Sequence, residues 1–326
     1  MKRAVGIDVG NHSIKLIELE EKRHFLELTK CGIARIFNSD TKSALKEIIS
    51  SQNLTTKRVN VSLAGLSVIV RYIEMPAMKK EELKSSIKFE AEKYIPFNIK
   101  DSIIDCAMLD KTASGQQRVI LVAVKRNEIR ELTQLFKDVG LDINIVDIDS
   151  FAFFNSFQRL NIAGIDKSTY ALLNIGSKLA NMNIVTNNNV FFTRDVLWGG
   201  SDLTNRVKDI MGIDFSEAEK IKENAVDKKE EMLGIIAPVL ERLSVQLRMS
   251  FDYFESQFGK TVETLYISGG TSYLFNMTDF FKDLLGIDTI MWNPFEGIQL
   301  SGTINEKEIS LNPSVFAVAM GLALRK

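Results

Sequence analysis

Two short segments, half a chain apart, share one pattern: an apolar strand that ends in a polar residue, an apolar residue and a glycine. The first is VGIDVG at residues 5–10, and the second is ALLNIG at residues 171–176. Glycine in such a hairpin allows close backbone approach, and successive N–H groups can converge on an anion. One copy is a weak signal, because Asp and Gly are ordinary turn residues. The repetition predicts two similar domains that face a cleft.

The first hairpin carries the chemistry of a phosphate site. Asp8, at the strand end, could hold a hydrated Mg²⁺ ion, which takes one or two carboxylates together with phosphate oxygens. Lys15 could offset phosphate charge, and His12 and Lys178 place cations in the two loops. The alternative is a plain hairpin whose turn carries polar side chains, as exposed turns commonly do.

A third glycine segment, LYISGGTS at residues 265–272, follows a short apolar strand and precedes a helix-like stretch. Two adjacent glycines allow the backbone to lie flat against a planar or anionic ligand. By itself Gly-Gly indicates only a turn, so this segment gains meaning from the two hairpins before it.

Composition excludes several classes of protein. The chain has 326 residues, 45% of them hydrophobic, and a formal net charge of -1, so it lacks the basic surplus that nucleic-acid binding depends on. Cys31, Cys106, His12 and His24 have no metal-cluster spacing. The opening residues run directly into a strand pattern, and no apolar run reaches the ~18 residues of a membrane span. We therefore expect a cytoplasmic protein that does not bind nucleic acid.

The periodicity of apolar residues predicts a mixed α/β chain. Helical spacing of Leu83, Ile87, Ala91 and Tyr94 predicts an amphipathic helix at 79–94, between two prolines. Residues 202–258 are predicted to be helical, with one long apolar stripe. The other predicted strands are 4–9, 14–19, 25–33, 59–63, 103–109, 118–124 and 144–148, and the other predicted helices are 41–51, 126–139 and 314–324.

The three glycine loops, followed by VFAVAMG at residues 315–321, resemble the phosphate 1, phosphate 2, adenosine and connecting motifs of the actin, sugar-kinase and heat-shock chaperone superfamily. A closer resemblance, over nearly the whole chain, is to the PilM family of type IV pilus assembly, which is FtsA-like. It is carried by VGIDVG at 5–10, MP at 75–76 with EAEKYIPF at 90–97, VDIDSFA at 146–152, FTRD at 192–195 with GG at 199–200, AEKIK at 218–222 and AMGLALR at 319–325.

The resemblance implies an α/β protein with the actin-like ATPase fold: two similar domains around a nucleotide cleft, with an inserted α+β subdomain of the FtsA/PilM type. Read with the element pattern, it predicts four parts. These are a first actin-like domain (1–77, 146–169 and 313–326), the insert (78–145), a second actin-like domain (170–203 and 260–312) and a helical subdomain (204–259).

The resemblance also implies a site for ATP or ADP with Mg²⁺ in the cleft, with the phosphates between the two hairpin loops and the adenosine near the third glycine loop. Asp8 would hold Mg²⁺ through water, with Asn174 as a second candidate, and no catalytic residue is assigned. The predicted nucleotide-binding residues are Asp8, Gly10, Asn11, His12, Ser13, Lys15, Gly176, Ser177, Lys178, Glu219, Lys222, Gly269, Gly270, Thr271 and Ser272.

As implied partners, the resemblance gives the short N-terminal cytoplasmic peptide of PilN, in a groove between the first domain and the insert, other platform and motor proteins of the pilus, and a further copy of the chain. The resemblance implies that the protein is cytoplasmic and lies at the inner face of the cytoplasmic membrane, where its partners hold it. The implied function is that of an ATP-binding scaffold of the inner-membrane platform.

Two departures from the family pattern bear on hydrolysis. The position of Asn174 is ordinarily Asp and that of Ala180 ordinarily Thr, so a carboxylate and a hydroxyl near the metal and phosphates are missing. An Asn can accept a bond from a metal-bound water, but it brings no charge and cannot act as a general base. We therefore expect nucleotide binding with slow or absent hydrolysis.

Three rival functions follow from the same fold. An FtsA-like division or cytoskeletal protein carries a C-terminal amphipathic helix beyond the last actin-like element, whereas this sequence stops at that element. A secretion-system relative usually continues into a membrane span. A small-molecule kinase needs a substrate-binding insert and cleft carboxylates that the sequence does not display.

Overall fold

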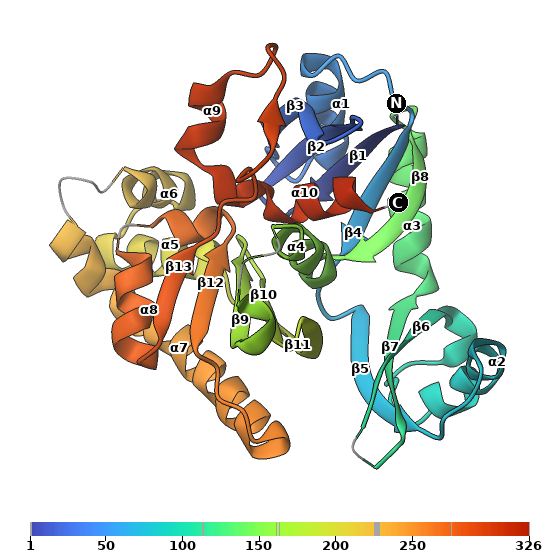
Figure 1. Cartoon of the computed structure of the whole chain (residues 1–326). Coiled ribbons are helices and arrows are strands. Elements are labelled where there is room, and N and C mark those ends of the chain that lie inside the picture. The colour runs from blue at the N-terminus through green and yellow to red at the C-terminus, as the bar shows by residue number, and fades with distance from the viewer. Residues whose placement is uncertain are drawn as a thin grey trace.

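The computed structural model describes residues 2–112, 114–160, 162, 164–224, 229–274 and 276–325, so residues 1 and 326 of the first predicted domain lie outside the described part. Its strands form three sheets, of six, five and three strands. The two larger sheets stand side by side, and the small sheet projects below the first one (Figure 1). None of the described helices is both long and apolar enough to cross a membrane.

The first sheet has the spatial order β14-β3-β2-β1-β4-β8. Its strands are β1 (Lys2–Val9), β2 (Ser13–Glu21), β3 (Leu26–Arg35), β4 (Arg58–Leu63), β8 (Asp142–Ile148) and β14 (Gln299–Leu300). β1, β2 and β3 are antiparallel neighbours, while β4 and β8 run parallel to β1. Helices α1 (Thr41–Ser51) and α3 (Arg126–Lys137) bury Leu45, Ile48 and Phe136 with the strand side chains in one cluster.

The second sheet, in the order β11-β10-β9-β12-β13, repeats this arrangement. Its strands are β9 (Thr169–Ile175), β10 (Ala180–Thr186), β11 (Asn189–Val196), β12 (Thr264–Ser268) and β13 (Asp288–Met291). Here too the first three strands are antiparallel, and the next two run parallel to the first. The sequence repeat therefore corresponds to two sheets with one topology.

The two glycine hairpins match residue for residue. In the β1–β2 hairpin Val9 pairs with Ile14, and the N–H of Gly10 donates to the carbonyl of Ser13 at 3.2 Å. In the β9–β10 hairpin Ile175 pairs with Ala180, and the N–H of Gly176 donates to the carbonyl of Leu179 at 2.9 Å. The pair Asp8–Lys15 in the first ladder thus corresponds to Asn174–Asn181 in the second.

Two central helices join the halves: α4 (Asp149–Gln158) packs on the second sheet, and α10 (Ala317–Leu324) packs on β1. They approach so closely that a Cβ on Gly321 would fall 1.6 Å from the carbonyl oxygen of Ala152. Only glycine leaves room for this crossing, because 1.6 Å lies far inside van der Waals contact.

The third sheet, β5-β7-β6, forms the insert with helix α2 (Lys80–Ala91). Its strands are β5 (Val68–Met75), β6 (Ser102–Lys111) and β7 (Gln117–Lys125). Leu83, Ile87 and Ala91 of α2 are buried against the strands, which confirms the predicted amphipathic helix.

In the described part of the predicted helical region 202–258 the chain forms α5 (Gly200–Met211), α6 (Phe215–Glu223) and α7 (Lys229–Phe258). They pack beside the second sheet together with α8 (Met277–Leu285). The apolar stripe of α7 lies in that core, where Leu243, Leu247 and Phe254 are fully buried.

Three elements pair or pack outside the domain to which the sequence assigns them, and the domain boundaries stay a prediction. β5 precedes residue 78 yet pairs along its whole length with β7 of the insert. β14 and helix α9 (Glu306–Leu311) fall within the range assigned to the second domain. However, β14 pairs with β3, and Ile309 packs with Leu28 of the first sheet.

Candidate functional site

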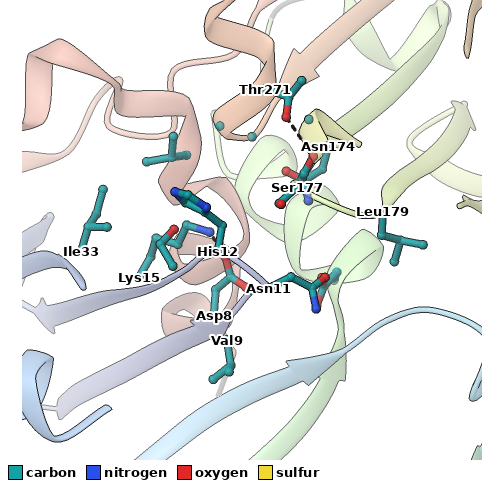
Figure 2. A pocket seen from close by; sticks show the side chains of 18 of the residues that line it. Asp8, Val9, Asn11, His12, Lys15, Ile33, Asn174, Ser177, Leu179 and Thr271 are labelled. Atoms are coloured by element: carbon teal, nitrogen blue, oxygen red, sulfur yellow. Dashed lines mark hydrogen bonds and ion pairs between the residues drawn. The ribbon is translucent and has the colours of Figure 1, made fainter. Parts of the chain in front are cut away.

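A cavity of about 810 Å³ lies between the two halves, at the tips of both hairpins (Figure 2). Most of the residues singled out in the sequence line it. These are Asp8, Gly10, Asn11, His12, Ser13, Lys15, Asn174, Gly176, Ser177, Glu219, Lys222, Gly269, Gly270 and Thr271. Segments separated by more than half of the sequence therefore meet at one site.

Two predicted site residues do not line the cavity. Lys178 is exposed at the tip of the second hairpin. Ser272 is completely buried behind the third loop, where its hydroxyl donates to the carbonyl of Gly269 at 2.6 Å. Ser272 thus supports the loop from behind, and Lys178 points to solvent.

The floor of the cavity on the first half is an ion pair between neighbouring strands. The ammonium of Lys15 lies 3.2 Å from Oδ2 of Asp8, and both side chains are largely buried. A carboxylate and an ammonium that face one cavity can bind a hydrated cation and an anion at the same time. Gly10 fits closely here, because a Cβ on it would lie 3.1 Å from the carbonyl oxygen of Ser13 and 3.3 Å from Lys15 Nζ.

On the second half a chain of amides replaces that ion pair. Asn174 donates to Asn181 at 3.4 Å, and Asn181 donates to Oδ1 of Asp195 at 2.6 Å. The other oxygen of Asp195 accepts the N–H of Gly65 at 2.7 Å, and Gly65 follows β4 in the first half. This chain connects the two halves beneath the hairpins.

The third glycine loop closes the cavity by touching the second hairpin. Gly269 has a left-handed φ of +92°, and a Cβ there would meet the carbonyl oxygen of Ile175 at 2.4 Å. Both observations require glycine. The hydroxyl of Thr271 donates to the carbonyl of Gly176 at 2.9 Å, which holds the two loops together (Figure 2).

Helix α6 forms a further wall through Glu219 and Lys222. The Lys222 ammonium donates to Oε2 of Glu219 at 2.8 Å and to the hydroxyl of Thr204 at 2.7 Å. Thr204 also donates to Glu219 Oε2. Burial acts to raise the pKa of Glu219, but the hydrogen bonds from Lys222 and Thr204 outweigh it and lower the pKa. Glu219 is therefore ionised at neutral pH.

His12 lies at the tip of the first hairpin, half-buried in the cavity (Figure 2). Burial lowers the pKa of His12, although the charge of Glu219 acts in the opposite direction. The imidazole is therefore mostly neutral at pH 7, and in this form one ring nitrogen is an acceptor.

The lining also includes residues that were not predicted from the sequence, among them the ionisable Asp149, Arg35 and Glu223 and the amide Asn181. Burial, followed by the nearby charge of Asp8, raises the pKa of Asp149 to about 7. A signal for Asp149 was present, because the acidic block at 146–152 ends β8 and begins α4. Arg35 and Glu223 pair across the cleft at 3.2 Å, and no local pattern indicates this contact.

Comparisons with known proteins agree with this architecture. The structure described as "PilM-PilN type IV pilus biogenesis complex" is 24% identical, with 99% of this chain and 98% of that chain covered and a TM-score of 0.89. Ethanolamine utilization protein EutJ from Carboxydothermus hydrogenoformans is 15% identical, with 99% and 90% covered and a TM-score of 0.61. MreB5 of Spiroplasma citri, bound to ADP, is 9% identical, with 98% and 95% covered and a TM-score of 0.54.

These likenesses confirm the predicted actin-like ATPase fold. The sequence model of the family described as "Type IV pilus assembly protein PilM" matches residues 6–326. The match covers nearly the whole chain and confirms the resemblance found in the sequence. The chain therefore belongs to the PilM family of type IV pilus assembly proteins.

Proposed function

We propose that this protein is a nucleotide-binding scaffold of the type IV pilus assembly platform, which binds the N-terminal cytoplasmic peptide of PilN and links it to the pilus motor. The observation that carries the nucleotide part is the pair of matched glycine hairpins facing one cavity, with Asp8 and Lys15 at its floor. The proposed role in pilus assembly rests on membership of the PilM family.

The cavity offers a suitable group for each part of Mg²⁺-ATP or Mg²⁺-ADP. The turns at Gly10 and Gly176 present backbone to the phosphates, and Lys15 offsets their charge. Asp8 holds the Mg²⁺ through water. The adenosine lies between the loop at Gly269 and the α6 wall at Glu219. A protein of related fold, MreB5 of Spiroplasma citri, is described as bound to ADP, which supports nucleotide binding as such.

Nucleotide binding is tested by calorimetric titration of the purified protein with ATP and with ADP in the presence of Mg²⁺. Lys15→Ala is expected to raise the dissociation constant about tenfold or more, because a hydrogen bond to a charged group contributes roughly 1.5–3 kcal/mol. Lys46→Ala, an exposed lysine on α1, is the matched control and leaves binding unchanged. Absence of binding at millimolar nucleotide, or equal effects of both variants, contradicts the proposal.

Turnover is expected to be slow or absent, because Asn174 and Ala180 stand where the family ordinarily has Asp and Thr. Asn174 lies within the amide chain to Asn181 and brings no charge to the phosphates. Steady-state release of phosphate from ATP measures this directly. Rapid phosphate release by the natural protein that is lost in Asp8→Ala would contradict slow turnover. It would not contradict the proposal that the protein binds nucleotide.

The partner is proposed from the family and from the related structure, which is described as a PilM-PilN complex. The groove for the PilN peptide lies between the first sheet and the insert. Fluorescence anisotropy with a labelled synthetic peptide of the PilN N-terminus tests this, with a scrambled peptide as the control. Saturable binding of the native peptide alone is expected, and equal or absent binding of both peptides contradicts the proposal.

The proposed location is the cytoplasmic face of the inner membrane, reached through PilN rather than through a lipid-embedded segment. Cell fractionation tests it: the protein is expected in the membrane fraction when PilN is present and in the soluble fraction when PilN is deleted. Retention in the membrane fraction without PilN would contradict partner-dependent attachment.

A further inference from the structure

One cluster in the lining of the cavity combines a histidine with two carboxylates, a set of groups that nucleotide binding alone does not require. The side chains of His12, Glu219 and Glu223 each offer one ligand atom, and these atoms all lie within 4.8 Å of one another. His12 comes from the first hairpin, and the two glutamates come from α6 beside the second sheet. The cluster therefore spans the two halves.

The three groups have the properties of metal ligands. Glu219 and Glu223 are four residues apart on α6, so both carboxylates lie on one face of the helix. Glu219 uses Oε2 for Thr204 and Lys222, and among the described residues its Oε1 has no hydrogen-bond partner. Neither ring nitrogen of His12 has such a partner in the described part of the chain.

We propose that His12, Glu219 and Glu223 bind a divalent transition-metal ion of the Zn²⁺ class, which joins the first hairpin to α6 across the cleft. One imidazole and two carboxylates, with a water in the fourth position, is a ligand set that Zn²⁺ accepts. Ligand atoms around tetrahedral Zn²⁺ lie about 3.3 Å apart, since its bonds are about 2.0–2.1 Å long. The ligand atoms of this cluster lie within 4.8 Å of one another, so they must approach by up to about 1.5 Å when the ion binds.

The guanidinium of Arg35 is already paired with one of the three proposed ligands, Glu223. Nη2 of Arg35 lies 3.2 Å from both carboxylate oxygens of Glu223, and this pair is partly exposed. An exposed ion pair contributes little free energy, so a metal ion can displace the guanidinium. Lys222, by contrast, is engaged with Gly200, Thr204 and Glu219 and holds the second ligand in place. Arg35 thus sets the affinity of the site without being a ligand.

The sequence provides a matched control, because the chain contains two histidines. Tag-free protein without nucleotide is titrated with Zn²⁺ by calorimetry and with Co²⁺ by visible absorption, in millimolar Mg²⁺. Magnesium occupies oxygen-only sites such as that at Asp8, whereas an imidazole ligand favours Zn²⁺ and Co²⁺. One ion per chain is expected. His12→Asn is expected to lower the affinity at least about tenfold, and His24→Asn, at an exposed position, leaves it unchanged.

Two further variants distinguish a ligand site from a general loss of structure. Arg35→Ala is expected to strengthen binding, because it frees Glu223, and Glu223→Gln is expected to weaken it. A general loss of structure would weaken metal binding in both variants and would not change their affinities in opposite directions. Absence of stoichiometric binding, binding that survives His12→Asn, or weaker binding in Arg35→Ala overturns the proposal. Since no nucleotide is present, the result is independent of the proposed ATP site.

Discussion

The hydroxyl of Tyr72 in the insert lies 2.8 Å from the hydroxyl of Thr193 in the second sheet. Thr193 donates its own proton to the amide oxygen of Asn183 at 2.8 Å, so Tyr72 must be the donor in the first bond. Asn183 in turn donates to the carbonyl of Ser150 at 2.6 Å, next to Asp149. A continuous path of hydrogen bonds thus runs from the insert to the backbone of Ser150, whose neighbour Asp149 lines the cavity.

Tyr72→Phe is predicted to loosen the insert from the second sheet. The variant loses the donor to Thr193 and keeps the ring, so we expect the free energy of unfolding to fall by about 0.5–1.5 kcal/mol. Amide hydrogen exchange should become faster in β11. The guanidinium of Arg118 over the ring of Phe191, at 3.7 Å, remains and limits the effect. Tyr94→Phe, at an exposed tyrosine of the insert, is the control, and equal effects of both variants refute the role of the hydroxyl.

Asp149→Asn is predicted to change how stability depends on pH. Burial raises the pKa of Asp149 from 3.8 to about 7, so between these values the folded protein holds a proton that the unfolded chain releases. The contribution of Asp149 to the free energy of unfolding is therefore greatest below about pH 4, and it falls as the pH rises to about 7. The total change is a few kcal/mol at most, because one pKa unit is about 1.4 kcal/mol.

The asparagine variant stays neutral, so its stability relative to the natural protein should increase between pH 4 and 8. Urea unfolding at several pH values, without Mg²⁺ or nucleotide, measures this, since a bound cation would favour the ionised carboxyl. Asp142→Asn, at an exposed position on β8, is the control. A difference in stability that does not vary with pH would show that Asp149 does not titrate in this range.

The repeated hairpins were predictable because each is a local pattern whose strand, turn and glycine lie within a dozen residues. The predicted segments at Asp8, Asn174 and Gly269 do meet at one cavity. The sequence placed Ser272 in the site, yet its side chain is buried behind the loop. The identity of a motif residue does not specify on which side of the backbone the side chain lies.

Contacts between distant segments were not predictable. The pair Arg35–Glu223 joins β3 to α6, and β5 leaves the first sheet to pair with β7. Neither depends on a pattern within one element, since both follow from how separate elements pack. Most of the described part of 202–258 is helical, as its local apolar spacing predicted, but the ends of α5, α6 and α7 were not predicted.

Gly321→Ala is predicted to be strongly destabilising, whereas Gly234→Ala is not. Both glycines lie in helices, where alanine is ordinarily preferred by about 1 kcal/mol. At Gly321 the new methyl group would lie 1.6 Å from the carbonyl oxygen of Ala152, while at Gly234 it meets nothing within 4 Å. Separating α4 from α10 should cost about 1–3 kcal/mol or more. Thermal unfolding of both variants measures this, and a stabilised Gly321→Ala would contradict the close crossing.

Asn174→Asp is predicted to raise the rate of ATP hydrolysis, because it restores a carboxylate opposite Asp8 and Lys15 at the cavity. The side chain faces Oδ1 of Asn181, which already donates its amide to Asp195. A carboxylate there faces an acceptor and adds to the acids Asp8 and Asp149 that line the same cavity, so binding of ATP should depend more steeply on Mg²⁺ than in the natural protein.

Phosphate release and calorimetric titration at several Mg²⁺ concentrations measure both effects of Asn174→Asp. Asn181→Asp, one strand away on the same amide chain, is the matched control: it adds the same charge at the position that corresponds to Lys15 rather than Asp8. Faster turnover is expected in the first variant alone. If neither variant hydrolyses ATP although both still bind it, the lost carboxylate is not what limits turnover in this chain.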